Sequence, residues 1–448
     1  MEVNVAGAGA GKTTKMADLI MSHDIPYGKI LFCIAFTNAA ADNIKQKVIE
    51  KLGAIPSNIK ISTIHSFLYQ ELIKPYYYFL YGKHFERLSI ITLPTKHTYK
   101  AQKLSELEAS NTLHFTKIPE KAKWVVSQKT RDKNSIKTIR QKILSRFVGY
   151  CAAIFVDEAQ DMSKDIYTTL IALDKAGVQI NLFGDPKQDV KGFNYFRKII
   201  DDKTAYVTYT QDCFRCPQKH LDLSNRFASA PEKQVADKKN AAGSISIIFE
   251  SDIENINEFI DVGNYGLRYI SKKCKRFDTH NENKKVGRFD TLWYEVSRAV
   301  NDKWQGQKTE NEIERFAFYV TEKMLECFDI SNHAYSVVEK FIKHGAFEKL
   351  PKKRYNQMIS AFKKKKVRSS DAVVVSSIEM VKGIEAERCL FILTTDLAPY
   401  LFQEKTDDNK MKHLLYVALT RSLDHLTILI TREVEDKYTR TYVADYFC

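Results

Sequence analysis

A glycine-rich stretch near the start of the chain has the residue types and spacing that bind phosphate. Residues 3–14 read V-N-V-A-G-A-G-A-G-K-T-T, an apolar run that leads through glycines to Lys12 and Thr13. Glycines let a backbone wrap closely round an anion, a following helix points N–H groups at it, and a lysine neutralises its charge. The first glycine of the usual pattern G-x-x-x-x-G-K-[ST] is Ala6 here. A chance glycine-rich turn is the alternative, and the helix expected over Lys15–Met21 argues against it.

Two carboxylates directly follow a second apolar run. Residues 151–156 read C-A-A-I-F-V, and Asp157 and Glu158 come next. Carboxylates at the tip of a buried strand cost free energy unless they meet a cation or a polarised water. Downstream of a phosphate-binding loop, the first can support Mg²⁺ and the second can deprotonate an attacking water. A helix N-cap is the alternative for Asp157. Gln188 follows another apolar run, 179–183, and is a candidate sensor of a γ-phosphate.

These motifs need a parallel α/β sheet to bring them together. Residues 29–37 form a continuous apolar run, which is typical of a parallel strand covered by helices on both faces. Ligands of such sheets bind outside the carboxyl ends of the strands, so the loops after the strands share one rim. Further strands of the first sheet are expected over residues 59–63, 151–156 and 179–183. A second sheet is expected to begin near residue 205, with strands over 205–210, 244–249, 372–376, 389–394 and 426–430.

The expected fold class is therefore α/β, with two P-loop-type domains that each carry a mainly helical insertion. The expected limits are 1–73 and 144–204 for the first domain, 74–143 for its insertion, 205–251 and 368–448 for the second domain, and 252–367 for its insertion. The first insertion opens with an aromatic run, 76–81, interpreted as packing rather than base stacking. The second contains a long amphipathic helix, Glu310–Phe328. Its two basic clusters fit either solvated faces or nucleic-acid contacts; they are Lys272, Lys273, Lys275 and Arg276, and Lys363–Lys366 with Arg368.

Composition narrows the partners and the compartment. The 448 residues carry a formal net charge of +14, which favours a polyanionic partner. Eight scattered cysteines and the lack of a signal-peptide pattern predict reduced thiols in a cytoplasmic protein. No apolar run reaches the roughly 18 residues of a membrane span, so no membrane partner is expected. Cys213 and Cys216 have metal-ligand spacing, but no second pair stands at a matching distance, and a structural zinc site is not expected.

Eight motifs in this order resemble those of the UvrD/Rep-like DNA helicases of superfamily one. They are A-G-A-G-A-G-K-T-T, A-F-T-N-A-A-A, S-T-I-H-S-F, V-D-E-A-Q-D, G-D-P-K-Q, C-F-R-C-P, V-K-G-I-E and Y-V-A-L-T-R, and the resemblance covers both sheet domains. It implies two RecA-like domains with ATP and Mg²⁺ between them and single-stranded or partly duplex DNA across both. The implied activity is DNA-dependent ATP hydrolysis coupled to movement on DNA with 3′-to-5′ polarity.

The resemblance also implies roles for individual residues. Nucleotide binding is implied for Ala8, Gly9, Ala10, Gly11, Lys12, Thr13, Thr14, Gly383 and Glu385. Thr13 and Asp157 would hold Mg²⁺. The catalytic set would be Lys12, Glu158 as the base, Gln188 as the link to DNA, and Arg215 and Arg421 as arginine fingers. DNA-facing positions would be Phe36, Thr37, Asn38, His65 and Phe193, although periodicity alone favours a core position for Phe193.

Departures from the family pattern keep other hypotheses open. Only five residues precede Ala6, so an upstream glutamine segment that reads adenine is not expected. Asn194 follows Phe193 where the family has an arginine, and Glu379 stands where motif V has a histidine. The second hypothesis is a nucleotide-gated DNA sensor or regulatory subunit of a nuclease complex, with little unwinding. Short, basic family members occur as helicase-like subunits of phage-defence pairs such as Gabija, whose partner is a nuclease. An RNA-directed helicase is a third hypothesis.

Overall fold

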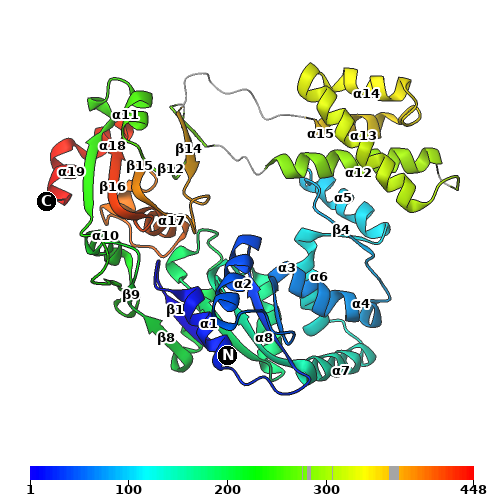
Figure 1. Cartoon of the computed structure of the whole chain (residues 1–448), viewed down its shortest axis with the longest axis horizontal. Helices are drawn as coiled ribbons and strands as arrows, with labels where there is room; N and C mark the ends of the chain where they lie inside the picture. The colour runs from blue at the N-terminus through cyan, green and yellow to red at the C-terminus, as the bar shows by residue number, and fades with distance from the viewer. Residues whose placement is uncertain (275, 280–283, 305, 363–372, 448) are drawn as a thin grey trace. The chain divides into compact units, whose positions relative to one another are not determined.

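The computed structural model describes every residue except 275, 280–283, 305, 363–372 and 448 (Figure 1). The chain divides into two compact units. The larger unit comprises residues 1–83, 118–280 and 371–448 and contains both six-stranded sheets. The smaller unit comprises residues 84–117 and 281–370. Parts of both segments that were expected as insertions therefore fold together in the smaller unit.

The first sheet carries the glycine-rich loop and the acidic pair. Its strand order is β3-β2-β6-β7-β1-β8, and all neighbouring strands are parallel. The strands are β1 (Glu2–Ala6), β2 (Ile30–Ala35), β3 (Ile59–Thr63), β6 (Cys151–Val156), β7 (Gln179–Gly184) and β8 (Val207–Thr210). Strand β7 separates β1, which leads into the loop, from β6, which ends at the acidic pair. Because all strands run the same way, their carboxyl ends bring these motifs to one rim.

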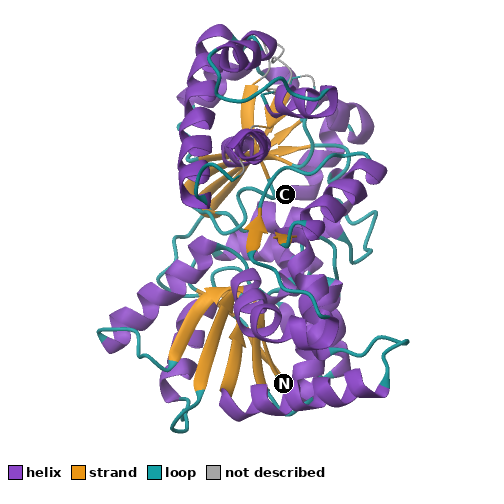
Figure 2. Ribbon diagram, turned by 90° about the vertical axis from the view of Figure 1, so that its right-hand side faces the viewer, coloured by secondary structure: helices purple, strands orange, loops and turns teal. Residues whose placement is uncertain are grey.

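Helices cover both faces of this sheet (Figure 2). They include α1 (Lys12–Ser22), α2 (Asn38–Leu52), α3 (Ile64–Phe67), α4 (Lys74–Tyr81), α6 (Ile118–Val126), α7 (Asn134–Tyr150), α8 (Lys164–Lys175) and α9 (Tyr195–Asp202). The central strands are almost entirely buried, as their continuous apolar sequence predicts. In the aromatic run, Tyr76, Tyr77 and Leu80 are buried, which confirms the packing interpretation for them, whereas Tyr78 and Phe79 are exposed.

The last strand of this sheet corrects one expectation. Residues 205–210 were expected to begin the second sheet, and that expectation is wrong. Strand β8 pairs in parallel with β1, with Val3 opposite Val207 and Ala6 opposite Thr210. The two strands are about 200 positions apart, and nothing in the residues of a short strand indicates so distant a partner. The sheet to which the strand belongs therefore cannot be predicted from its own residues.

The second sheet is also parallel throughout, in the order β11-β16-β15-β12-β14-β13. Its strands are β11 (Ser244–Phe249), β12 (Leu267–Ile270), β13 (Phe277–Thr279), β14 (Val373–Ser377), β15 (Ala386–Leu393) and β16 (Ser422–Ile430). Its helices are α10 (Gln218–Ser224), α11 (Ile256–Val262), α16 (Ala398–Leu401), α17 (Lys410–Leu419), α18 (Arg432–Tyr438) and α19 (Arg440–Phe447). The fold class α/β with two parallel sheets is thus confirmed.

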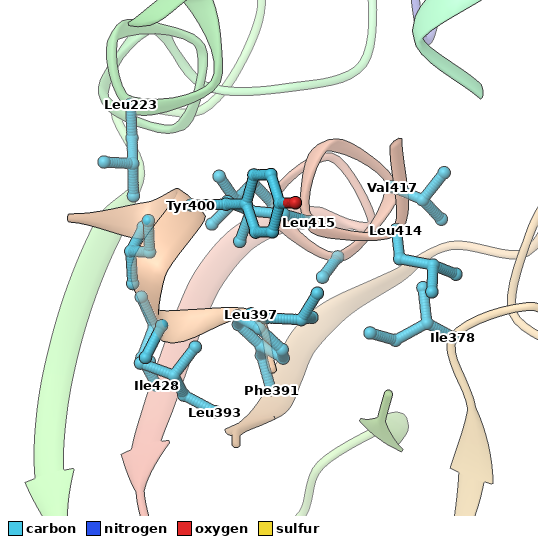
Figure 3. Packing of buried hydrophobic residues seen from close by; sticks show 14 of the residues in the cluster. Leu223, Ile378, Phe391, Leu393, Leu397, Tyr400, Leu414, Leu415, Val417 and Ile428 are labelled. Carbon is cyan, nitrogen blue, oxygen red and sulfur yellow. The ribbon is translucent and has the colours of Figure 1, made fainter. Parts of the chain in front are cut away.

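Two strands of this sheet lie in the segment expected as the second insertion. Strands β12 and β13 pair with β14, so the sheet extends beyond residue 251 and that limit needs correction. The core on one face joins Phe391 and Ile428 from the strands to Leu414, Leu415 and Val417 from helix α17 (Figure 3). This packing fixes helix α17, whose last turn leads to Arg421.

The smaller unit is mainly helical. It contains β4 (Arg87–Ser89), β5 (Thr112–His114), α5 (His97–Ala109), α12 (Lys284–Trp304), α13 (Glu310–Ser331), α14 (Ala334–Lys343) and α15 (Lys352–Ala361). The expected amphipathic helix is confirmed as α13, which begins with a capping box between Thr309 and Glu312. Of the predicted basic clusters, Lys275 and residues 363–368 lie outside the described residues.

Arg276, which belongs to the larger unit, does not present a free cation. Its guanidinium pairs with Glu250 at 2.6 Å and with Glu433 at 2.6 Å. These two carboxylates compete with any phosphate for the same N–H groups, which favours a structural role for this member of the basic cluster. Across the described residues, no helix combines the length and apolar character needed to cross a membrane.

Candidate nucleotide and nucleic-acid site

The glycine-rich loop has a backbone that only glycine adopts without strain. Gly9 and Gly11 have φ values of 68° and 71°, in the left-handed region. Gly11 is the N-cap of α1 and supplies no side-chain cap, and the first turn of this helix has no acidic residue. The partial positive charge and the N–H groups at this helix end are therefore not compensated by a protein side chain. This is the local arrangement that binds phosphate.

Lys12, Thr13 and Asp157 lie beside this loop. Lys12 Nζ donates to the carbonyl oxygens of Ala6 at 3.2 Å and Gly7 at 3.1 Å. Thr13 Oγ1 donates to Asp157 Oδ2 at 3.2 Å. Burial, followed by the charge of Glu158, raises the pKa of Asp157 to about 6. A desolvated carboxylate beside a threonine hydroxyl supplies the oxygen ligands that Mg²⁺ prefers, so these residues fit the implied metal.

Glu158 has a strained backbone and cationic neighbours. Its φ is 53°, a left-handed value that costs a non-glycine residue about 1 kcal/mol. Its carboxylate accepts a hydrogen bond from Gln160 Nε2 and lies 3.6 Å from Lys382 Nζ. Burial alone would raise the pKa of Glu158, but Lys12 and Lys382 hold it below its usual value. Glu158 is thus an ionised carboxylate that can accept a proton.

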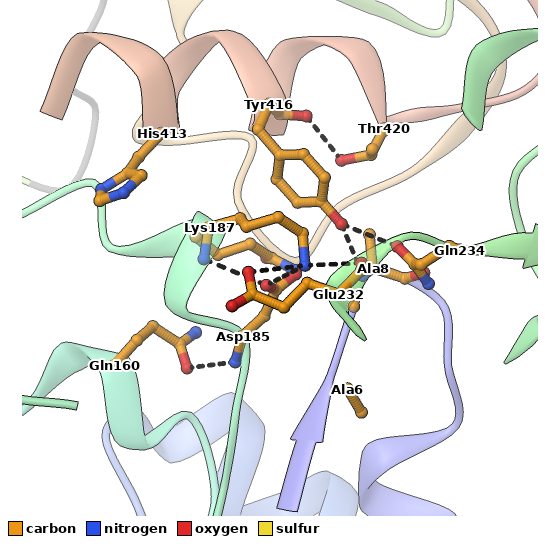
Figure 4. A network of polar contacts seen from close by, with 12 residues as sticks. Ala6, Ala8, Gln160, Asp185, Lys187, Glu232, Gln234, His413, Tyr416 and Thr420 are labelled. Carbon is orange, nitrogen blue, oxygen red and sulfur yellow. Dashed lines mark hydrogen bonds and ion pairs between the residues drawn. The ribbon is translucent and has the colours of Figure 1, made fainter. Parts of the chain in front are cut away.

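Gln188 lies in a buried polar network on the same rim. Its Nε2 donates to Asp185 Oδ2 at 3.0 Å, and the Asp185 N–H donates to Gln160 Oε1 at 3.0 Å. Lys187 Nζ lies 3.0 Å from Asp185 Oδ1 (Figure 4). The network joins the end of β7 to the short helix that contains Gln160, next to Glu158. Hydrogen bonds through Asp185 and Gln160 therefore connect Gln188 to Glu158.

Residues that follow the first sheet in the sequence also contact the loop directly. The Ala8 N–H donates to Tyr416 Oη at 3.2 Å, and Tyr416 Oη donates to Gln234 Oε1 at 2.8 Å (Figure 4). Gln234 Nε2 donates to the Ala8 carbonyl oxygen at 3.0 Å, and Cys213 Sγ lies 3.1 Å from the same oxygen. The Phe214 N–H donates to the Gly9 carbonyl at 2.9 Å. The C-F-R-C segment and helix α17 therefore form a second wall against the loop.

The two predicted arginine fingers lie on this wall, in different surroundings. A methyl group on Gly9 would lie 2.3 Å from Arg215 Cβ, so Arg215 packs directly on the loop. Its guanidinium pairs with Glu385. Arg421 is fully buried; its Nε donates to the Val417 carbonyl at 3.1 Å and its Nη1 is unpaired. Burial, with Arg215 nearby, lowers the pKa of Arg421.

Three predicted DNA-facing side chains surround one lysine. Lys191 Nζ lies 5.8 Å from the Phe36 ring centre and 6.0 Å from that of Phe193. Burial, followed by the charge of Lys191, lowers the pKa of His65. Phe193 is 39% exposed, so the core position favoured by periodicity is wrong. Aromatic rings beside a cation are typical of sites that bind single-stranded nucleic acid.

The other predicted site residues make fewer contacts with the residues described above. Thr37 is the N-cap of α2 and accepts from the Ala40 N–H at 3.1 Å, while Asn38 begins that helix and is exposed. Ala10 is buried in the loop, and Thr14 is exposed on α1. Gly383 has a left-handed φ of 81° and open space where a Cβ would lie.

Several residues at the site were given no role in the sequence analysis, although some of them lie inside the quoted motifs. Lys382 reaches Asp161 at 2.7 Å as well as Glu158. Phe214 is 59% exposed, and its ring would lie 3.8 Å from a methyl group on Gly11, which places an aromatic face at the mouth of the loop. Lys191, Gln234 and Tyr416 act through contacts made after folding. The lysine and phenylalanine inside V-K-G-I-E and C-F-R-C were the available signal.

Comparison with known proteins gives a partial match. Residues 2–194 match a protein-family model described as AAA domain, a stretch that contains the glycine-rich loop, the acidic pair and Gln188. No curated protein sequence matches the chain. Among solved structures, a complex of Arterivirus nonstructural protein 10 (helicase) with DNA is similar, with 11% sequence identity and a TM-score of 0.37. The similarity covers 95% of this chain and 59% of that one, so this chain spans about three fifths of its relative's length.

Proposed function

We propose that the chain is an Mg²⁺-dependent ATPase that couples hydrolysis to movement on single-stranded DNA. One observation carries the proposal. Arg215 and Arg421 both lie on the wall formed by the C-F-R-C segment and helix α17, and the phosphate-binding loop beside this wall leads to a helix N-terminus without a side-chain cap. Arg421 is completely buried, and its Nη1 has no acceptor among the described residues. Nε and Nη2 have acceptors, but a buried N–H group without one costs about 1–3 kcal/mol, which an anionic ligand would offset. A transferring γ-phosphoryl group is such an anion, since its transition state spreads charge over its oxygens.

Each polar group at the loop then has a distinct task. Lys12 leaves the Ala6 and Gly7 carbonyls and neutralises the terminal phosphates. Thr13 and Asp157 would hold Mg²⁺, and a bound ion would supply Lewis-acid polarisation of the phosphate oxygens. Glu158 orients the attacking water and takes its proton, a task suited to a carboxylate that Lys12 and Lys382 keep ionised. Arg215 exchanges Glu385 for phosphate oxygens. The groups that would contact the phosphates come from two sides, the glycine-rich loop and the wall that carries Arg215 and Arg421. Hydrolysis therefore depends on how closely these two sides approach each other.

The nucleobase and the nucleic acid have separate candidate surfaces. The exposed Phe214 ring offers a face beside Gly11 on which a base would stack. Lys191, between Phe36 and Phe193, offers a phosphate contact beside two rings. Lys191 would supply the positive charge that the family's arginine provides at the position of Asn194. Polarity of 3′ to 5′ and a nuclease partner rest on the sequence resemblance and stay predictions.

Hydrolysis measurements on purified protein test the proposal. We expect single-stranded DNA to stimulate ATP hydrolysis and Lys12→Ala to reduce the rate at least about 100-fold, the scale expected when a transition-state contact is lost. Lys15→Ala, one turn further along α1, is the matched control. A strand-displacement assay separates a helicase from a nucleotide-gated sensor, and stimulation by RNA in place of DNA would favour an RNA-directed enzyme. Equal hydrolysis by the wild type and Lys12→Ala would contradict the proposal.

A further inference from the structure

Two cysteines bracket Arg215 and touch the phosphate-binding loop. The Cys216 N–H donates to Cys213 Sγ at 3.3 Å, and Cys213 Sγ lies 3.1 Å from the Ala8 carbonyl oxygen. Cys216 Sγ lies 3.6 Å from the Thr420 carbonyl oxygen, next to Arg421. Both side chains have no exposed surface. The pair therefore connects the loop, one arginine and the residue before the other.

The two thiols have opposite acid strengths. The hydrogen bond from the Cys216 thiol, with backbone N–H groups of Cys216 and Arg215, lowers the pKa of Cys213 to about 6 against the effect of burial. The same contact, together with burial, raises the pKa of Cys216. At neutral pH this arrangement gives a thiolate beside a thiol. A thiolate is the nucleophile in cysteine oxidation, and the neighbouring thiol can resolve the product.

We propose that Cys213 and Cys216 are a modification site that hydrogen peroxide converts to a disulfide. The Cys213 thiolate attacks one peroxide oxygen, the O–O bond breaks, and the departing hydroxide takes the proton of the Cys216 thiol and leaves as water. The Cys216 thiolate then attacks Cys213 Sγ, the S–O bond of the sulfenic acid breaks, and its hydroxide leaves as a second water with a proton from solvent. Two electrons pass from the sulfur atoms to the peroxide.

The modification changes the wall against the loop. Disulfide bonding brings the two sulfur atoms to about 2.05 Å, closer than any hydrogen-bonded pair of thiols. Cys213 Sγ then loses its contact with the Ala8 carbonyl oxygen. Phe214 and Arg215 lie between the two cysteines, and the Phe214 N–H is bonded to Gly9. The turn that closes must therefore shift Arg215 relative to the loop.

Among the described residues, the other cysteines lack this combination of features; Cys389, for example, is buried, and burial raises its pKa. Cys33 and Cys151 are buried on the first sheet, and burial raises their pKa. Cys274 is exposed and Cys327 is half-buried. Because Cys213 is covered by Ala8, oxidation requires this contact to open, whereas Cys274 is open to solvent. Cys274 therefore provides a matched control for general oxidation.

Mass spectrometry of the peptide that spans residues 213–216 tests the site directly. The full-length protein is treated with hydrogen peroxide in the native state, and free thiols are then alkylated. We expect this peptide to lose two hydrogen atoms and to regain them with dithiothreitol, in the wild type and in Cys274→Ser. Cys213→Ser and Cys216→Ser should form no such bond. Two alkylated thiols at 213 and 216, when Cys274 is already oxidised, would overturn the proposal, as would irreversible sulfinic acid at Cys213.

Nucleotide hydrolysis tests the consequence, which rests on the proposed function. A displacement of about 1 Å at a catalytic group can cost 100-fold in rate, so we expect a reversible loss of roughly 10- to 100-fold in oxidised wild type and Cys274→Ser. Cys213→Ser and Cys216→Ser should each keep their own untreated rate. A disulfide with an unchanged rate would overturn the regulatory effect. A chain that hydrolyses no nucleotide before oxidation would instead refute the proposed function, because the mass readout does not depend on activity.

Discussion

Asp157 combines a structural cost with the proposed role in holding Mg²⁺. Its carboxyl is buried at the end of β6, and its pKa of about 6 exceeds the ordinary value of 3.8. The folded protein therefore binds this proton more tightly than the unfolded chain does. As a result, the free energy of unfolding falls as pH rises from about 4 to about 6. The site holds a carboxylate ready for a cation at the expense of stability.

Asp157→Asn should separate these two effects. Without Mg²⁺, we expect the variant to be more stable than wild type at neutral pH, by up to about 3 kcal/mol for a shift of about two pKa units. It should nevertheless lose Mg²⁺-dependent hydrolysis. Urea unfolding over a pH series measures the first effect, and the difference should vanish near pH 4. Asp24→Asn, at an exposed side chain, is the control; a destabilised Asp157→Asn at neutral pH would contradict the argument.

Lys382 should set the pH range of hydrolysis. Its ammonium lies 3.6 Å from Glu158 Oε2 and helps to lower the pKa of that carboxyl. Lys382→Gln removes this charge, so the pKa of Glu158 rises and a higher pH is needed to ionise it. We expect the acid limb of the pH–rate profile to move to higher pH. Lys410→Gln, which removes an exposed partner of Glu379, should leave the limb in place; coincident limbs for Lys382→Gln and wild type would exclude the role.

For single residues, the sequence predicts which side chains gather at the site better than it predicts which of them touch across the two sheets. Lys12, Thr13, Asp157 and Glu158 lie together because strand ends in a parallel sheet share a rim, so their motifs suffice. Tyr416 and Ala8 meet across 408 residues, and Lys382 and Asp161 across 221. Such contacts depend on how two sheets pack, which no local pattern encodes. The predicted roles of the site residues therefore remain hypotheses with a geometry to test.

At the scale of elements, the loop from β1 to α1 is tightly constrained. Gly9 has a left-handed φ, and a methyl group there would collide with Arg215 Cβ at 2.3 Å. Gly53, at the C-cap of α2, has a φ of 77° and no atom within 4 Å of its Cβ position. The two glycines share the backbone requirement and differ in their neighbours. Comparing them isolates the contact between the loop and the C-F-R-C segment.

Alanine substitutions should show this difference. We expect Gly53→Ala to cost about 1 kcal/mol, the strain of a left-handed non-glycine residue. Gly9→Ala should cost at least about 1 kcal/mol more, because two backbones must also separate. Chemical unfolding of both variants gives the two free energies. Equal costs would mean that the segment does not rest on the loop in solution.

Strand prediction gave the right bounds for three strands of five or six residues. Residues 59–63, 151–156 and 244–249 were predicted with the bounds that the structure has. Strands β12 and β13 have four and three residues, too few for any period to stand out. The edge strand β8 was predicted, but it was assigned to the wrong sheet. A short strand can pair with any exposed sheet edge, and tertiary packing determines which edge it joins.

The charge of the whole molecule should govern its affinity for nucleic acid. A net charge of +14 attracts a polyanion at long range, and each phosphate contact releases counterions. We expect the affinity for a single-stranded oligonucleotide to fall steeply with salt, and Lys191→Gln to reduce the log–log slope by about 0.7. Fluorescence anisotropy over a salt series measures both. Lys45→Gln, paired with Asp42 on α2, is the control; an unchanged slope for Lys191→Gln would remove this lysine from the DNA surface.

Strand order also has a consequence for synthesis of the chain. Strand β1 is made first, yet its neighbours β7 and β8 begin at residues 179 and 207. At 5–20 residues per second, the ribosome needs roughly ten to forty seconds to supply them. During that interval an apolar segment has no partner and is a ready target for chaperones. Once β7 and β8 emerge, β1 must enter between them, so the phosphate-binding loop takes its final form only after both strands have been made.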